Sequence, residues 1–102
     1  PDHVGERPLR TVTIRRGHGM KRGDIYQEID LERDRQHEKW SGLHDWGYGD
    51  ASSLGVAPIT KVAVLTEEVG EVARAVLELD DAQLKTELIQ VAAVAVAWLE
   101  AM

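Results

Sequence analysis

The stretch that decides the fold is LTEEVGEVARAVLEL, residues 65–79. It belongs to a longer segment, 58–79, in which apolar residues recur at spacings of three and four, the period of an amphipathic α-helix. Those residues are Ile59, Val62, Leu65, Val69, Val72, Val76 and Leu79. Pro58 suits the first turn of such a helix, and Gly70 inside it would permit a close crossing of another helix.

Two further helices are expected on either side of this one. Segment 24–40 has a helical pattern, with Asp24 as the predicted N-cap, and it ends before the glycine-rich SGLHDWGYGD. Segment 82–102 follows a break at which Asp80 or Asp81 can cap the helix. From Leu88 onward this segment is apolar nearly all round, so we expect a central, buried helix. The sequence therefore predicts the all-α class, a helical bundle rich in small side chains.

Two regions do not follow the helical pattern. Residues 41–57 form a long loop, and loops of this length in compact domains are often functional. Its aromatic residues, Trp46 and Tyr48, either stack on a base or cover a pocket, or else pack beneath the loop as a small apolar cluster. Residues 1–23 are expected to be a flexible basic arm, partly non-native if Met20 is the natural start.

Composition and charge narrow the possible function. A chain of 102 residues is one domain's worth, and the absence of cysteine excludes disulfides and thiolate metal sites. The longest apolar run is nine residues, too short for a bilayer, so a cytoplasmic location without membrane contact is expected. Residues 1–23 carry six Lys or Arg and two acids, a charge of +4. Residues 24–102 carry six Lys or Arg and sixteen acids, a charge of −10. This negative charge argues against nucleic-acid binding and suits the binding of a divalent cation.

Three acids crowd one side of the helix predicted over 58–79. Because each residue advances by about 100°, Glu71 lies about 40° and Glu68 about 100° from Glu67, all within one arc. On the next helix Glu87 and Gln90 are three residues apart and share a face. Partly buried carboxylates are costly unless their charge is compensated. A Mg²⁺ ion, which takes oxygen ligands, would compensate it, although acid pairs on helices are more commonly a solvated surface.

The spacing of these acids is similar to that of a known family. EEVGE on one helix and ELIQ on the next, with Glu87 sixteen residues after Glu71, resembles the MazG-like all-α nucleotide pyrophosphohydrolases, whose pattern is E-E-x-x-E, a spacer, then E-x-x-D. The segment ERDRQHEKW, residues 32–40, also resembles the region of these proteins where a charged helix ends in Lys-Trp. The resemblance covers residues 24–102, the predicted helical domain.

The resemblance implies an all-helical bundle, completed by oligomerisation, that uses Mg²⁺ to cleave a nucleoside triphosphate into a monophosphate and pyrophosphate. Mn²⁺ would be able to substitute for Mg²⁺. Glu68, Glu71 and Glu87 match metal-ligand positions, and Glu67 matches the acid that joins the metals or positions the attacking water. Gln90 stands where the family has Asp. Its amide oxygen can bind Mg²⁺ but brings no charge, which leaves open whether activity is retained, altered or absent.

Substrate contacts and assembly complete the expectations. Lys61 and Lys39 are candidates to counter phosphate charge, or are plain surface cations. Trp40 is a candidate for base stacking, or packs at the helix end. Because three helices with so apolar a third member cannot cover it alone, we expect a homodimer or a dimer of dimers. The alternative function is a catalytically degenerate MazG-like dimer that serves as a nucleotide-binding or regulatory module.

Overall fold

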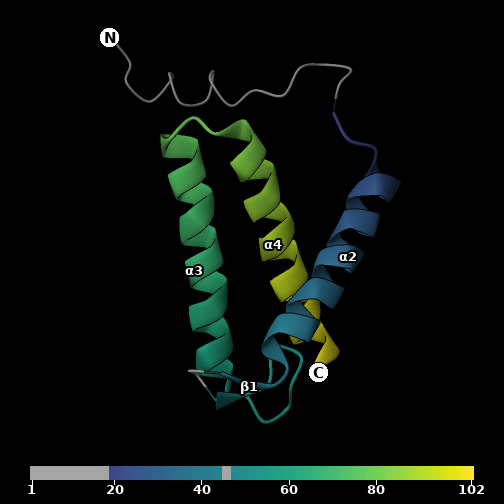
Figure 1. The fold of residues 1–102 in the computed structure, drawn as a ribbon, viewed down its shortest axis with the longest axis vertical. Coiled ribbons are helices and arrows are strands. Elements are labelled where there is room, and N and C mark those ends of the chain that lie inside the picture. Colours follow the sequence, from purple (N-terminus) through teal and green to yellow (C-terminus); the bar gives the residue numbers. More distant parts are fainter. Residues whose placement is uncertain (1–18, 45–46) are drawn as a thin grey trace.

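The computed structural model describes residues 19–44 and 47–102 of the chain. In this part lie three helices, α2 (Arg22–Trp40), α3 (Pro58–Leu77) and α4 (Asp81–Glu100), and two short strands, β1 (Leu43–His44) and β2 (Gly47–Tyr48). Helices α3 and α4 form an antiparallel hairpin, and α2 packs across α4 (Figure 1). The predicted all-α class is confirmed. Of the predicted basic arm, residues 1–18 lie outside the described residues.

The helix starts follow local chemistry, with one correction. The prediction that Asp24 caps the first helix is wrong, because Ile25 already donates its backbone N–H to the Lys21 carbonyl at 3.0 Å, so α2 begins at Arg22. Asp24 lies instead in the first turn, where its negative charge interacts favourably with the helix dipole. Pro58 opens α3 as predicted. Asp80 caps α4 by accepting the Gln83 backbone N–H at 2.9 Å.

The turn between α3 and α4 forces one residue into an unusual conformation. The helix ends at Leu77, two residues earlier than its apolar pattern indicates. Asp80 then donates its N–H to the Ala75 carbonyl at 3.0 Å, and Leu79 adopts a φ of 57°. This left-handed conformation closes many helices, and glycine is the residue that adopts it without steric cost.

Replacing Leu79 with glycine is therefore expected to stabilise the protein. We expect Leu79→Gly to raise the free energy of unfolding by roughly 0.5–1 kcal/mol, because it relieves the left-handed strain of a residue with a Cβ. The Leu79 side chain is 58% exposed, so little packing is lost. Urea denaturation measures the change. Leu77→Gly is the matched control, and it should destabilise α3 because its backbone is helical; a Leu79→Gly protein less stable than the wild type would contradict the account.

The loop predicted over 41–57 contains a small hairpin. Strands β1 and β2 pair in antiparallel register, Leu43 with Tyr48 and His44 with Gly47. Strands of two residues leave no periodic signal, which is why the sequence did not predict them. Gly49 follows with a φ of 94°, and a Cβ there would lie 2.5 Å from Ser53 Oγ, so the turn requires glycine. Trp46 and the side chain of Tyr48 lie outside the described part of the chain.

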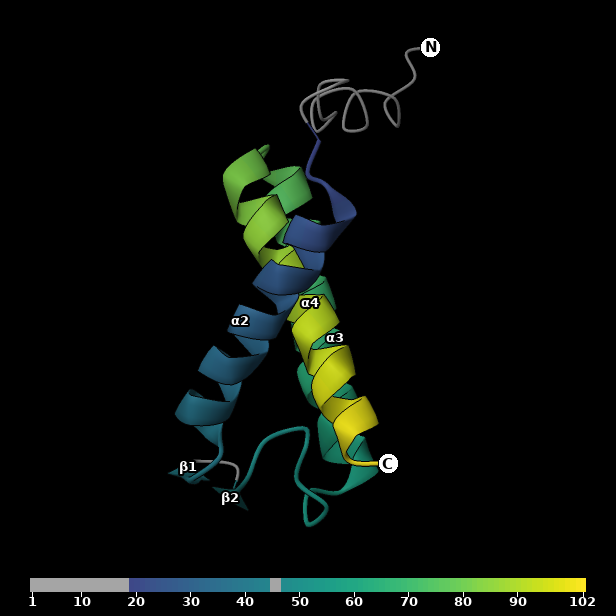
Figure 2. The same cartoon turned by 90° about the vertical axis from the view of Figure 1, so that its right-hand side faces the viewer.

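The apolar core within the described chain is small. Its buried members are Ala75, Ala93, Val94 and Ala97, all from α3 and α4. Helix α4 packs against both other helices (Figure 2), which confirms its predicted central position. The prediction that it is buried from Leu88 onward is wrong within one chain, because Leu88 is 51% and Leu99 65% exposed. At Gly70 an added Cβ would meet no atom within 4 Å in the described structure, so no helix crosses closely there.

Candidate functional site

A cavity of about 520 Å³ opens between the three helices and the loop that precedes α3. Its walls include most of the residues that the sequence singled out. These are Lys39, Trp40, Lys61, Glu67, Glu68 and Gln90. Glu71 and Glu87 do not line it. Two of the four predicted metal-binding residues, Glu68 and Gln90, therefore share one cavity with Glu67 and the predicted substrate-binding residues, although they are drawn from α2, α3 and α4.

The acids of α3 lie close enough to other carboxylates to affect their ionisation. Burial, together with the charges of Glu87, Glu67, Glu32 and Glu71, raises the pKa of Glu68 above its ordinary value. The charge of Glu87 acts on Glu68 from α4. Glu32 approaches from α2, and sequence reasoning missed it because its own helix offers no acidic motif. Carboxylates of three helices are thus close enough to act on Glu68 electrostatically.

Glu87 has an unmet bonding capacity. It is only 6% exposed, and its Oε2 accepts a hydrogen bond from the Gln83 side-chain amide. Its Oε1 is buried and has no hydrogen-bond partner within residues 19–44 and 47–102. A buried carboxylate oxygen without a partner carries the full cost of its lost hydration. A cation or a donor supplied from outside the chain would remove that cost.

The donor set fits Mg²⁺ in its chemistry, whereas its geometry is not yet that of a metal cage. Glutamate and glutamine oxygens are the hard ligands that Mg²⁺ takes, and the Glu87 oxygen is available. In the described residues no three His, Asp or Glu side chains are gathered as a metal site. Glu71, for example, turns to Arg74, with its Oε1 3.5 Å from Arg74 Nη1. Binding an ion would require the carboxylates to move together.

Lys61 is a buried cation in the cavity wall. It is only 4% exposed, so the expectation of a plain surface cation is wrong. On α3 it stands seven residues, about two helical turns, before Glu68, and both therefore face the same side of the helix. Its ammonium has no hydrogen bond or ion pair with any residue that the structure describes. The Nζ atom itself keeps some contact with solvent, and an unpaired positive charge in a cavity wall favours the binding of an anion.

Trp40 and Lys39 stand at the more exposed end of the cavity. Trp40 is 42% exposed, so its ring is not packed into the core at the end of α2. Lys39 Nζ lies 5.0 Å from the centroid of that ring, a cation–π distance. The His44 ring meets Trp40 edge-on with centroids 5.1 Å apart. This end of the cavity presents an aromatic surface held by its neighbours.

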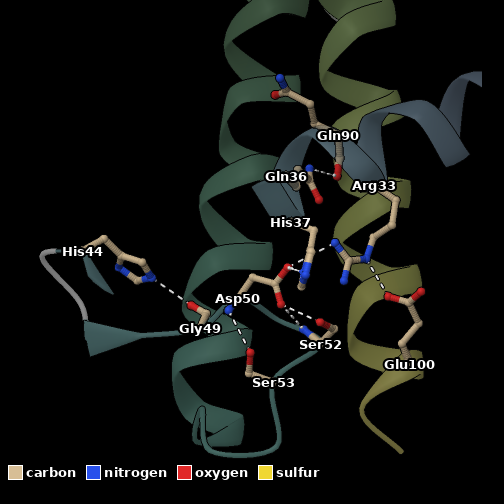
Figure 3. Close-up of polar contacts among 10 residues, drawn as sticks. All are labelled: Arg33, Gln36, His37, His44, Gly49, Asp50, Ser52, Ser53, Gln90 and Glu100. Carbon is tan, nitrogen blue, oxygen red and sulfur yellow. Dashed lines mark hydrogen bonds and ion pairs between the residues drawn. The ribbon is translucent and has the colours of Figure 1, made fainter. Parts of the chain in front are cut away.

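The loop wall of the cavity is fastened by Asp50 (Figure 3). Its Oδ2 accepts a hydrogen bond from Arg33 Nη1 at 3.1 Å and contacts His37 Nδ1 at 3.0 Å. Its Oδ1 accepts bonds from the backbone N–H of Ser52 at 2.9 Å and from its hydroxyl at 2.6 Å. Burial alone would raise the pKa of Asp50, but these bonds and the charge of Arg33 lower it overall. The carboxylate is thus held in its ionised form.

Further contacts tie this wall to the helices. Arg33 Nε donates to Glu100 Oε1 at 2.6 Å, linking α2 to the end of α4. His44 Nε2 lies 2.8 Å from the Gly49 carbonyl oxygen, as Figure 3 shows. The sequence did not predict this cluster, because a single Asp in a glycine-rich loop forms no recognisable motif with its neighbours in the sequence. The cluster fixes the loop as a structural wall and leaves the chemistry to the acids and Lys61.

Comparisons with known proteins do not identify the chain. No family model, no curated protein and no solved structure matches it. Within residues 19–44 and 47–102, no helix combines the length and apolar character needed to cross a membrane. The function is therefore argued from the cavity and its residues.

Proposed function

We propose that this chain is a MazG-like, Mg²⁺-dependent nucleotide pyrophosphohydrolase, which converts a nucleoside triphosphate into a monophosphate and pyrophosphate. The observation that supports this most strongly is the shared cavity. It has Glu67 and Glu68 in its wall together with the buried, unpartnered Lys61. Carboxylates suit a cation and the unpaired ammonium of Lys61 suits an anion, and a metal-bound phosphate supplies both charges.

Glu68, Glu71, Glu87 and Gln90 are the residues that would hold the ion. Bound Mg²⁺, or Mn²⁺ in its place, would lower the pKa of a coordinated water and offset phosphate charge. The free Oε1 of Glu87 favours uptake of a cation, and so do the burial and the neighbouring carboxylates that raise the pKa of Glu68. Gln90 contributes an amide oxygen without charge, so the cluster relies on its glutamates for affinity.

The other cavity residues would act on the substrate and the water. Glu67 is exposed, lines the cavity and would accept the proton of the attacking water. Lys61 would hold phosphate oxygens from its buried position, and Lys39 would reinforce it from the rim. The exposed ring of Trp40 offers a face for the nucleobase. Each of these roles uses a group where the cavity already places it.

Product analysis tests the proposal. The four ribonucleoside and four deoxyribonucleoside triphosphates are incubated with the protein, with Mg²⁺ or with EDTA, and the products are separated by ion-exchange chromatography. We expect Mg²⁺-dependent formation of monophosphate and pyrophosphate from at least one nucleotide. Formation of diphosphate and orthophosphate instead would contradict cleavage between the α and β phosphates.

A second candidate function follows from Gln90. Its neutral amide lines the cavity, and the described carboxylates are not gathered into a cage. Both features suit a degenerate relative that binds nucleotide without cleaving it. Saturable nucleotide binding by calorimetry, with no product from any of the eight nucleotides, would favour this nucleotide-binding or regulatory module over the enzyme.

We also propose that the protein assembles as a homodimer or a dimer of dimers in the cytoplasm. Large apolar side chains remain exposed along α3 and α4. They are Ile59, Val62, Val69, Leu77, Leu88, Val96 and Leu99. On α3 these residues recur at helical spacing and form one stripe. The apolar stripes of two antiparallel helices can pack against the same helices of a second copy of the chain. Such a partner would enlarge a core that has four buried apolar residues among those described.

Sedimentation velocity tests this assembly. We expect the wild type to sediment as a dimer or a tetramer, and Val69→Glu to shift it to a monomer, because the charge would be buried in the stripe. Leu54→Glu is the matched control, since Leu54 is 85% exposed in the loop, outside both helices. A monodisperse wild-type monomer would rule out the proposed assembly.

A further inference from the structure

Arg35 stands between two cavities. It lines the first cavity together with Glu67 and Glu68. It also lines a second cavity of about 490 Å³, formed by α2 and α4, together with Glu32 and Lys85. Arg35 therefore borders both the cavity that contains Glu67 and Glu68 and the cavity between α2 and α4.

The guanidinium of Arg35 is held in a fixed orientation. Its Nε donates to Glu32 Oε1 at 2.8 Å and its Nη2 to Glu32 Oε2 at 2.5 Å. Glu32 is well covered, with a side chain only 13% exposed, whereas that of Arg35 is 54% exposed. A two-bond fork of this kind fixes the plane of the guanidinium as well as its position. Glu32 thus holds the accessible guanidinium of Arg35 in position.

Arg35 lies in the same cavity wall as other residues proposed to contact the substrate. Arg35 and Lys39 are four residues apart on α2, so they share a helix face, and both line the first cavity. Glu67 and Glu68 line the same cavity from α3. The hydrogen bonds to Glu32 chiefly raise the pKa of Arg35, and the charge of Glu68 adds to this effect, which places the guanidinium within electrostatic reach of the acids.

We propose that Arg35 binds the phosphate chain of the substrate and the pyrophosphate product, and that Glu32 is a positioning residue that holds its guanidinium for this contact. The inference rests on the proposed function and extends it to two residues outside the acidic motifs. A guanidinium has five N–H donors. The pair with Glu32 uses two nitrogens of the fork, which leaves donor capacity for phosphate oxygens.

A simpler role for Arg35 gives a different result. If it only offsets the charge of Glu68, its loss would change the metal affinity of the acids but not the affinity for a polyphosphate. Binding of inorganic pyrophosphate separates the two roles. It is measured by calorimetry with the full chain at saturating Mg²⁺, so that metal occupancy is held constant among the variants.

Four variants make the test specific. We expect Arg35→Gln to weaken pyrophosphate binding by about 10-fold or more, the loss typical of a charge-assisted contact. Arg35→Lys should recover part of the affinity, because it keeps the charge without the fork. Glu32→Gln should weaken pyrophosphate binding by about threefold, because the guanidinium remains but loses the carboxylate that holds it in position. Arg22→Gln removes the same charge from an exposed position lining neither cavity and should leave binding unchanged.

Wild-type affinity in Arg35→Gln would overturn the inference, and so would a wild-type protein that binds no pyrophosphate. If Arg35→Gln fails to fold by circular dichroism, Glu32→Gln decides, because unchanged binding in that variant contradicts the positioning role. The proposed function fails in a different way. A wild type that hydrolyses no nucleotide but binds pyrophosphate through Arg35 would exclude the enzyme and leave the Arg35 contact standing.

Discussion

Glu68→Gln is expected to make the metal-free protein more stable and to lower its catalytic activity strongly. The folded-state pKa of Glu68 is raised, by burial and by neighbouring carboxylates. An acid whose pKa is raised by folding destabilises the fold when it is ionised. This destabilisation by ionised Glu68 is absent at pH values below the unfolded-state pKa and reaches its full size above the folded-state pKa. At neutral pH the uncharged glutamine removes it, so we expect the melting temperature in EDTA to rise by a few degrees.

Catalysis should change in the opposite direction. Removing a carboxylate ligand should lower Mg²⁺-dependent pyrophosphate release by about 100-fold or more, because even changes outside the ligand shell cost 10–100-fold. Asp34→Asn is the matched control, since Asp34 is exposed on α2 and lines neither cavity. The stability gain of Glu68→Gln over the wild type should also shrink as the pH falls toward the unfolded-state pKa. A gain that persists in acid would show that the charge is not its cause.

Lys61→Met is the second substitution with a large expected effect. The substitution keeps much of the side-chain length and removes an ammonium that has no partner among the described residues, on a side chain that is 4% exposed overall. Partial loss of hydration around an unpaired charge is costly, so the ligand-free protein should gain thermal stability. A phosphate held by Lys61 would lose a charge-assisted bond of about 1.5–3 kcal/mol, which lowers kcat/KM by roughly 10- to 150-fold.

Lys85→Met provides the matched control for this prediction. Lys85 lies on α4, where its Nζ is 3.4 Å from Glu28 Oε2 and its side chain is 53% exposed. Its loss should leave kcat/KM within error, because it does not line the first cavity. Melting curves and initial rates for both variants give the answer. A Lys61→Met protein that is less stable and equally active would show that the ammonium has a structural role.

The sequence predicted the helices because their chemistry is local. The period of the apolar residues on α3, the proline at its start and the cap at Asp80 all act within a few residues of one another. The same locality explains the errors. Nothing near Leu79 shows that the chain must turn there in a left-handed conformation, and the pairing of β1 with β2 involves two residues on each side.

The cavity was predictable only in part. The acidic motif on α3 predicted that Glu67 and Glu68 lie within one arc of the helix, and both line the cavity, whereas Glu87 of α4 does not. The burial of Lys61 and the place of the Arg35–Glu32 pair in the cavity wall depend on how the helices pack against one another. The spacing of residues along one helix does not reveal this packing. Asp50 was missed for the same reason, since its partner Arg33 lies 17 residues before it on α2. Arg33 in turn binds Glu100, near the end of α4.

A titration with Mn²⁺, followed by electron paramagnetic resonance, tests most directly whether the acids of α3 and α4 form a metal centre. The wild type and Glu87→Gln are compared, because this substitution replaces the one buried carboxylate with an unpartnered oxygen among the described residues. We expect saturable binding to the wild type and an affinity at least about 10-fold weaker in Glu87→Gln, with unchanged helical content. Equal binding by both proteins, or no binding by the wild type, would contradict the metal centre and the hydrolase built on it.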